Sequence, residues 1–132
     1  MQTINRIWVN GCFDVLHRGH IELLQYAKSK GDYLIVGIDS DTRVKESKGL
    51  KRPVNTQEDR KFFLEAITYV DEVKVFNNDS ELIESIKKCS PRYLIVGSDW
   101  KGRNVIGSEN AQEVLFFDRV GDYSTTKILE SK

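Results

Sequence analysis

The sequence predicts one α/β domain with a doubly wound, mostly parallel sheet of five strands and helices on both faces. Short apolar runs alternate with segments in which apolar residues recur at helical spacing. These runs are nearly continuous, which is typical of strands buried on both faces of a parallel sheet. With 132 residues, the chain is long enough for one core and short for two, so we expect residues 1–132 to form a single domain.

The first half of the chain follows this alternation from its start. The apolar run at 7–10 predicts a strand, and apolar residues spaced by three and four predict a helix over 20–30. Gly31 follows as a glycine just past a helix end commonly does. A second apolar run predicts a strand at 33–38. The stretch 43–53 is dense in lysine and arginine and has a single glutamate, so we expect a mobile basic loop there.

The second half of the chain continues the pattern. Between the halves, Asp39-Ser40-Asp41 is equally consistent with a helix cap and with a substrate contact. Thr56 or Asn55 is expected to cap a helix that reaches Tyr69. The remaining expected elements are a strand at 70–76, a helix at 81–88, a strand at 93–97, a short helix near Glu109, a strand at 113–117 and a final helix at 127–131.

One stretch near the start, residues 9–20, concentrates residues with useful chemistry. A strand leads through a glycine turn into a helix, with His17 and His20 at the helix entrance. A helix start carries unpaired N–H groups and a partial positive charge, and Gly11 and Gly19 let a ligand approach the backbone closely. These features predict a phosphate site. The alternatives are histidines that only cap the helix and a metal site, but few carboxylates lie nearby, so we expect no metal ligands.

The same stretch resembles a known family. Gly11-Cys12-Phe13-Asp14 followed by His17-Arg18-Gly19-His20 resembles the HxGH signature of the cytidylyltransferase-like nucleotidyltransferases. Arg60 after the turn 53–55, and Ser124-Thr125-Thr126 before a last helix, follow in the family's order, so the resemblance covers nearly the whole chain. It implies a Rossmann-like fold and nucleotidyl transfer. A phosphate monoester would attack the α-phosphorus of a nucleoside triphosphate, and pyrophosphate would leave.

The resemblance also implies catalytic roles. His17 and His20 would bind the phosphates and stabilise the α-phosphoryl group in the transition state. Lys48, which we favour over Lys45, would contact the triphosphate from the basic stretch. Arg60 would clamp the phosphates with two parallel hydrogen bonds. Mg²⁺ would bind mainly through the triphosphate, with few protein ligands.

Other positions are expected to complete the site. Asp14 would orient the loop or a metal-bound water, and Ser124 and Thr125 would reach the β- and γ-phosphates. Asp99 and Trp100 would accept from an amino group of the base and stack on its ring. The full set expected to bind nucleotide is Gly11, Cys12, Phe13, Asp14, His17, Gly19, His20, Lys45, Lys48, Arg60, Asp99, Trp100, Arg119, Ser124 and Thr125.

Two branches of the family, which use different substrates, each resemble part of this sequence. Residues 99–102 and Arg119 resemble glycerol-3-phosphate cytidylyltransferase, whereas residues 9–14 and 48–55 resemble the adenylyltransferase domain of ADP-heptose synthase. We favour CTP, because Trp100 and the turn at Arg119 would exclude a purine, with a phosphorylated polyol such as glycerol 3-phosphate as acceptor. The alternatives are an adenylyltransferase that uses ATP and a sugar 1-phosphate of the heptose type, and a catalytically silent nucleotide-binding module.

Composition narrows the partners. Lysine plus arginine and aspartate plus glutamate number 20 each, so zero net charge supports neither nucleic-acid binding nor a polybasic membrane contact. No apolar run approaches the roughly 20 residues that span a bilayer. Residues 1–6 lack a signal pattern, and the two cysteines suggest no disulfide framework, so we expect a cytoplasmic protein. Two-fold dimers are the commonest oligomers, and members of the family commonly dimerise, so we expect a homodimer.

Overall fold

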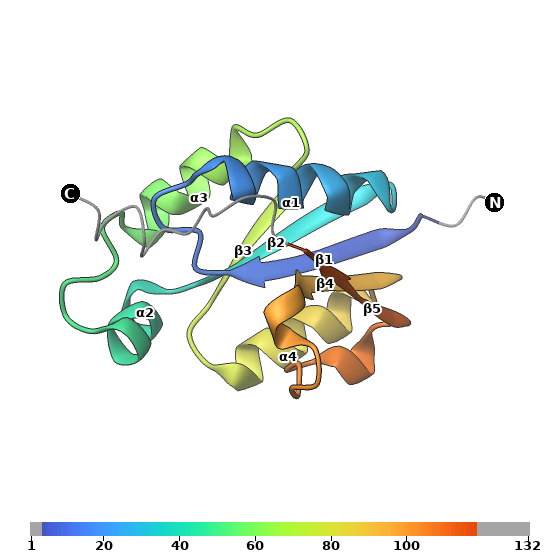
Figure 1. Cartoon of the computed structure of the whole chain (residues 1–132). Coiled ribbons are helices and arrows are strands. Elements are labelled where there is room, and N and C mark those ends of the chain that lie inside the picture. Colours follow the sequence, from blue (N-terminus) through green and yellow to red (C-terminus); the bar gives the residue numbers. More distant parts are fainter. Residues whose placement is uncertain (1–3, 119–132) are drawn as a thin grey trace.

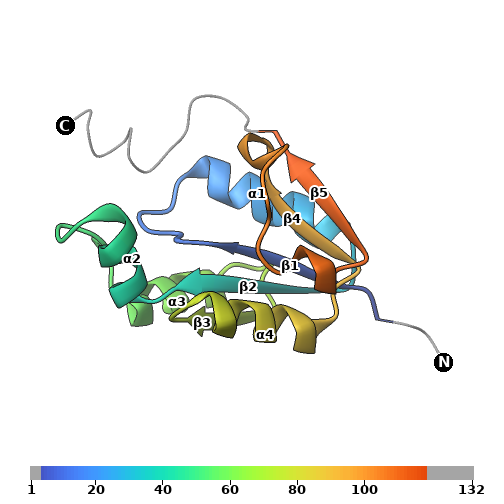
Figure 2. The ribbon, with the colours of Figure 1, turned by 90° about the horizontal axis from the view of Figure 1, so that it is seen from below.

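The strand β1 (Arg6–Gly11) lies in the middle of the sheet that organises the domain. The computed structural model describes residues 4–118, in which five strands form one sheet in the order β3-β2-β1-β4-β5 (Figure 1, Figure 2). All four pairings are parallel, so the carboxyl ends of all five strands lie at the same end of the sheet. The other strands are β2 (Tyr33–Asp39), β3 (Glu72–Phe76), β4 (Tyr93–Gly97) and β5 (Glu113–Phe117).

Helices cover both faces of this sheet, as the sequence predicts. Figure 1 shows α1 and α3 on one face and α4 on the other. The short helix α2 lies instead beyond the carboxyl ends of the strands (Figure 2). The helical elements are α1 (Arg18–Ser29), α2 (Asp41–Lys48), α3 (Gln57–Glu65) and α4 (Asp79–Cys89), with 3₁₀ turns η1 (Ser98–Trp100) and η2 (Ser108–Asn110).

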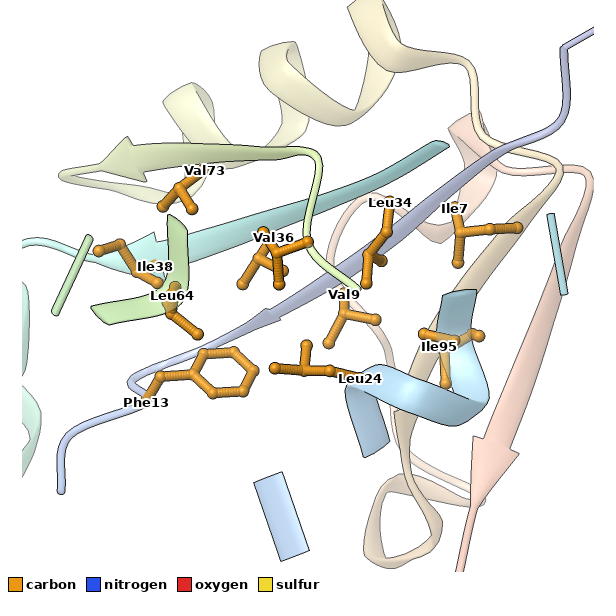
Figure 3. Packing of buried hydrophobic residues seen from close by; sticks show 12 residues of the cluster. Ile7, Val9, Phe13, Leu24, Leu34, Val36, Ile38, Leu64, Val73 and Ile95 are labelled. Carbon is orange, nitrogen blue, oxygen red and sulfur yellow. The ribbon is translucent and has the colours of Figure 1, made fainter. Parts of the chain in front are cut away.

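Two apolar clusters fill the space between the sheet and its helices. The strand β1 supplies both, because successive side chains of a strand point to opposite faces. Ile7 and Val9 pack with Leu24 of α1 in the cluster shown in Figure 3. Trp8 packs with Ile86 of α4 in the other cluster. The central strand is therefore buried on both faces. This packing fixes the position of its carboxyl end, from which the loop to α1 begins.

The largest difference from the sequence prediction lies at residues 41–48, which form the helix α2 rather than a loop. Ser40 caps this helix, because its hydroxyl accepts a hydrogen bond from a backbone N–H of the first turn. Gly49, with φ of 98°, follows as the C-cap residue. Lys45 and Lys48 fall in the last turn, where cations stabilise the helix C-terminus. The helix-cap interpretation of Ser40 is thus confirmed.

The helix expected over 57–69 ends at Glu65, four residues early. Beyond it, the N–H groups of Ile67 and Val70 bond to carbonyls three residues back, which turns the chain tightly toward β3. Ile67 and Thr68 are β-branched, and such residues favour helix less than unbranched ones. The tight turns therefore replace the last helical turn that the apolar spacing predicted.

Other boundaries shift slightly. Helix α1 begins at Arg18, two residues before its predicted start. Helix α4 also begins two residues early, at Asp79, because Asn78 caps it. The strand β3 begins two residues later than predicted, at Glu72. The bounds of β4 and β5 and the short helix near Glu109 are confirmed, whereas the helix expected at 127–131 lies outside the described residues. Across residues 4–118, no helix is long and apolar enough to span a membrane.

Candidate functional site

The loop between β1 and α1 is held in an unusual backbone conformation. Phe13 and Val15 have φ of 51° and 54°, in the left-handed region that a β-branched residue rarely adopts. Phe13 is only 5% exposed and points into the core beside Leu24 (Figure 3), so it anchors the loop. At Gly11, an added Cβ would lie 3.2 Å from the Phe13 ring, which favours glycine there. Packing therefore maintains a strained loop, as is common at functional sites.

His17 and His20 together cap α1. The His17 Nδ1 accepts a hydrogen bond from the Gly19 N–H at 3.0 Å, and the His20 Nδ1 accepts one from the His17 N–H at 3.1 Å. The two rings stack with centroids 3.9 Å apart, and the His20 ring also packs against Phe13 at 5.2 Å. An imidazole nitrogen that accepts a hydrogen bond carries no proton. These bonds therefore assign the proton of each neutral ring to Nε2.

This arrangement shows the helix cap that the sequence offered as one interpretation of the histidines. The Nδ1 atoms do what a Ser or Asn cap does, satisfying N–H groups at the start of a helix. The Nε2–H groups are hydrogen-bond donors of the kind that binds phosphate oxygens. Capping also fixes the orientation of both rings.

Asp14 ties this loop to the connection between α2 and α3. It is buried, and its Oδ2 accepts from the Val54 N–H at 2.7 Å while its Oδ1 accepts from the Asn55 N–H at 2.9 Å. The Arg52 guanidinium forms an ion pair with the same carboxylate, with Nε and Oδ2 3.2 Å apart. Asp14 thus orients a loop, one of the two roles expected for it.

Arg60 links three segments at the carboxyl end of the sheet. Its Nη1 donates to the carbonyls of Cys12 at 2.9 Å and Asp39 at 2.7 Å, which follow or end β1 and β2. Its Nε donates to the Asn55 carbonyl at 3.1 Å, and its Nη2 donates to Asp41 Oδ1 at 2.9 Å. The side chain is fully buried. The structure therefore assigns this guanidinium to holding the loops in place.

The bidentate phosphate clamp expected of Arg60 is not the geometry observed. Four donor contacts already go to protein acceptors, and the side chain does not reach solvent. Sequence reasoning missed the acceptors because most are backbone carbonyls, which no motif displays. One signal was available, since Arg60 precedes Leu64 by four residues and so shares its buried helix face.

Lys45 and Lys48 are both exposed on α2. Burial raises the pKa of the Cys12 thiol, and the positive charges of Lys48 and Arg60 oppose that rise. Of the two lysines, Lys48 is the one whose charge acts on this thiol in the loop after β1.

Arg52 is a residue that the motif analysis did not single out. Its Nη2 is buried and has no hydrogen-bond partner within residues 4–118. Its Nε is fixed by the ion pair with Asp14. Leaving a buried donor unsatisfied costs about 1–3 kcal/mol, so a ligand oxygen at this position would be favoured.

The region expected to meet the base is described only in part. Trp100 is 41% exposed in η1, at the carboxyl end of β4, and the Arg103 guanidinium lies 6.0 Å from its ring centre. The backbone of Asp99 lies in the same turn. Arg119, Ser124 and Thr125 lie outside the described residues.

The described residues supply no ready-made metal cage. In the 4–118 range, no three His, Cys, Asp or Glu side chains gather closely enough to hold an ion. The Asp14 carboxylate already accepts three hydrogen bonds from protein groups.

Comparison with known proteins agrees with this geometry. A family model described as cytidylyltransferase-like matches residues 8–130. The bifunctional protein HldE of Campylobacter fetus is 49% identical over 93% of the chain, and that of Sulfurimonas denitrificans is 49% identical over 94%. The chain spans only about a quarter of these relatives, 27% and 26% of their lengths.

Solved structures show the same fold at low sequence identity. A lipopolysaccharide core biosynthesis protein from Thermoplasma volcanium superposes with a TM-score of 0.69 at 21% identity, covering 92% of this chain and 100% of that one. A pantothenate synthetase from Thermus thermophilus superposes with a TM-score of 0.62 at 13% identity, covering 94% and 61%. With the HxGH residues at the helix entrance and the match to residues 8–130, the chain belongs to the cytidylyltransferase-like family of nucleotidyltransferases.

Proposed function

We propose that the chain transfers the adenylyl group of ATP to a sugar 1-phosphate and releases pyrophosphate. Support comes from residues 9–14 and 48–55, which resemble the adenylyltransferase domain of ADP-heptose synthase, and from the similarity to HldE proteins. The CTP preference expected from Trp100 and Arg119 has weaker support from these relatives. The observation that carries the chemistry is the pair of capping histidines, with both Nδ1 atoms bonded to the backbone.

The reaction exchanges one phosphoanhydride bond for another. An oxygen of the acceptor phosphate forms a bond to the α-phosphorus of ATP, while the bond from that phosphorus to the α,β-bridging oxygen breaks. The electron pair of the broken bond leaves with pyrophosphate. Because the acceptor phosphate is already an anion near neutral pH, the step needs positioning and charge neutralisation more than a strong base.

In this proposal, His17 and His20 donate from Nε2 to oxygens of the triphosphate. The fixed rings act on the charge that develops at the α-phosphoryl group, and the N-terminus of α1 adds a partial positive charge. Gly19 is the second residue of α1, and its lack of a side chain would let a phosphate approach the backbone there.

Arg52 and Lys48 supply the cations that Arg60 does not. The buried Nη2 of Arg52 would donate to a β- or γ-phosphate oxygen, and Lys48 would add a second positive charge from the end of α2. Mg²⁺ bound through the phosphates would neutralise part of the triphosphate charge. The side chains of Ser124 and Thr125 remain proposed contacts of the same phosphates.

A competition experiment tests the substrate assignment. The protein is mixed with equal ATP, CTP and GTP, Mg²⁺, glucose 1-phosphate, a heptose 1-phosphate and glycerol 3-phosphate, and the products are resolved by mass. We expect an adenylylated sugar as the main product, with none from a His20→Ala control. An excess of cytidylylated glycerol phosphate would overturn the proposal in favour of the CTP alternative. Tight ATP binding without any product would identify a silent module.

A homodimer is a separate proposal. Phe62 and Phe63 on α3 are 69% and 44% exposed, and their rings contact edge to face with centroids 6.1 Å apart. Exposed adjacent aromatics of this kind are common at protein interfaces. Light scattering at micromolar concentration should give twice the chain mass, and Phe62→Glu should lower it. A monomer mass for the unchanged protein would contradict the dimer.

A further inference from the structure

Both histidines of the chain, His17 and His20, lie at the start of α1 and cap it. Histidine is the side chain whose ordinary pKa lies between about pH 5 and 8. Burial raises the pKa of the Cys12 and Cys89 thiols, which moves both further above neutral pH. Histidine titration near neutral pH therefore belongs entirely to this pair.

In the cap, each ring accepts a hydrogen bond through the nitrogen that a second proton would occupy. The Gly19 N–H donates to His17 Nδ1 at 3.0 Å, and the His17 N–H donates to His20 Nδ1 at 3.1 Å. Since Nε2 holds the proton of each neutral ring, an added proton must go to Nδ1. There it would face a backbone N–H, so two donors would be opposed. Charging a ring therefore breaks the hydrogen bond by which that ring caps the helix.

The packing of the two rings adds a second obstacle to charging them. Their centroids are 3.9 Å apart with an interplanar angle of 26°, so two positive rings would repel each other at close range. The His20 ring also packs at 5.2 Å against Phe13, which is buried, so turning that ring away from the cap would break this contact. Neither ring can take up a proton and keep both its cap bond and its packing.

The charged groups around the histidine loop give an imidazolium little support. The carboxylates of α1, of the loop after β1 and of the end of β2 each pair with a cation: Glu22 with Arg18, Asp14 with Arg52, and Asp39 with Arg43. Asp41 of α2 pairs likewise with Arg60 of α3. Lys48 adds a positive charge that acts on Cys12 in the same loop. A new positive charge on a histidine would therefore meet cations and carboxylates that are already paired.

From this geometry we propose that His17 and His20 form an acid-sensitive cap, which holds the start of α1 and the Nε2–H donors in place only while both rings are neutral. The unfolded chain takes up the same protons without breaking a cap, so it binds more protons than the folded state as pH falls. The stability that the cap contributes is therefore complete above the ordinary histidine pKa of about 6.5 and is lost as pH falls below it. Mild acid also displaces the donors proposed to bind phosphate, so it switches the site off.

NMR on ¹⁵N-labelled protein tests the acid-sensitive cap without any ligand. The ring nitrogen signals report charging, and the Gly19 and His17 amide signals report the two cap hydrogen bonds. As pH falls from about 7.5 to 5.5, we expect these amide signals to shift in step with the rings. The Arg43 amide, which the Ser40 hydroxyl caps at the start of α2, is the matched control and should move little. Rings that become charged while the Gly19 and His17 amide signals stay in place would overturn the proposal.

A matched variant removes the titration and keeps the cap. His17→Asn combined with His20→Gln places neutral acceptors at the two positions that a capping box uses. In urea unfolding, the folding equilibrium constant of the unchanged protein should fall by up to about tenfold per histidine between about pH 7.5 and 5.5. The variant should lose much less, because only the remaining titratable groups contribute to its decline. Equal declines in the two proteins would contradict the acid-sensitive cap.

Ligand affinity gives a test in which simple charge attraction predicts the opposite result. ADP-glucose is the probe, because its diphosphate diester keeps the same charge over this pH range. Charged histidines that stayed in place would bind it more tightly in acid, whereas the acid-sensitive cap predicts at least about fivefold weaker binding at about pH 5.5 than at about pH 7.5. Tighter binding in acid would overturn the proposal. This last measurement rests on the proposed transfer reaction, so a failure to bind ADP-glucose at any pH would count against that reaction, while the ring and amide titrations decide the cap itself.

Discussion

The two ends of the sheet use charged side chains in opposite ways. At the carboxyl end, Asp14 and Arg60 are buried and bonded mainly to backbone groups of neighbouring loops. At the amino end, Arg6 and Lys88 are exposed at the rim of a pocket. A buried charge is tolerated only when its partners are fixed, so the carboxyl end is rigid before any ligand arrives. The exposed cations Arg6 and Lys88 remain solvated, so their charges carry little desolvation penalty in the folded state.

This contrast supports placing the proposed transfer reaction at the carboxyl end of the sheet. Transition-state stabilisation works best with groups that need no reorganisation, and the loops at the carboxyl end are tied by Arg60.

Removing Arg60 should cause the largest loss of stability at the carboxyl end of the sheet. Arg60→Ala leaves the carbonyls of Cys12 and Asp39 and the carboxylate of Asp41 without their partner, so we expect a loss of about 3–5 kcal/mol in unfolding free energy. Urea unfolding followed by circular dichroism measures it. Lys61→Ala, at the next position of α3, is the control and should cost less than about 1 kcal/mol. A loss as small as that of the control would mean that the loops do not depend on this guanidinium.

Changing His17 should separate the two roles of that ring. His17→Asn retains a side-chain acceptor suited to capping α1 but lacks the Nε2–H, so unfolding free energy should change by less than about 1 kcal/mol. Turnover should fall about 100-fold, as when one preorganised donor to developing charge is removed. Turnover within threefold of the unchanged protein would contradict the donor role.

Changing Arg52 should affect nucleotide binding at the carboxyl end without removing the positive charge. Arg52→Lys can keep a positive charge beside Asp14 but lacks the second guanidinium nitrogen, so we expect KM for ATP to rise about tenfold with a smaller change in kcat. Lys51→Gln, one residue earlier and exposed, is the control for general charge. Steady-state kinetics at constant ionic strength distinguish the two. Equal KM values for both variants would rule out a specific contact from Nη2.

The smallest expected effect concerns the amino end. Burial raises the pKa of the Cys89 thiol to about 11 from an ordinary value of 9.0. The folded state holds this proton more tightly than the unfolded state, so its contribution is complete below pH 9 and is lost as pH rises toward 11. At pH 10 the loss is about 1.4 kcal/mol relative to pH 7. Cys89→Ala should abolish that part of the alkaline decline in urea unfolding experiments, and an unchanged pH profile would contradict it.

The sequence was sufficient to predict that all five strands exist, two of them with the observed bounds, and to identify the loop between β1 and α1. Tyr93–Gly97 and Glu113–Phe117 are short runs rich in apolar residues, and their bounds are those predicted. The histidines were correctly placed at a helix entrance, because Gly11 and the apolar spacing that follows are both local signals.

The rest depended on contacts between distant segments. Helix α2 has Val44 as its one buried residue, so its apolar pattern is too weak to identify it. It is held by its cap and by Arg43, which bonds Asp39 at 2.7 Å and Asp79 at 2.7 Å. Likewise, a helical arginine gave no sign that carbonyls 21 and 48 residues away would accept its hydrogen bonds.

The central place of β1 also affects how the protein can assemble as it is synthesised. The strand pairs with β2 soon after it is made, but its other edge must wait for β4, whose first paired residue, Tyr93, lies 86 positions beyond its partner Ile7. Until the ribosome has released that segment, the histidine loop extends from a strand with one unpaired edge. An unpaired edge can pair with another chain, so this edge of β1 is open to intermolecular pairing until β4 has been made.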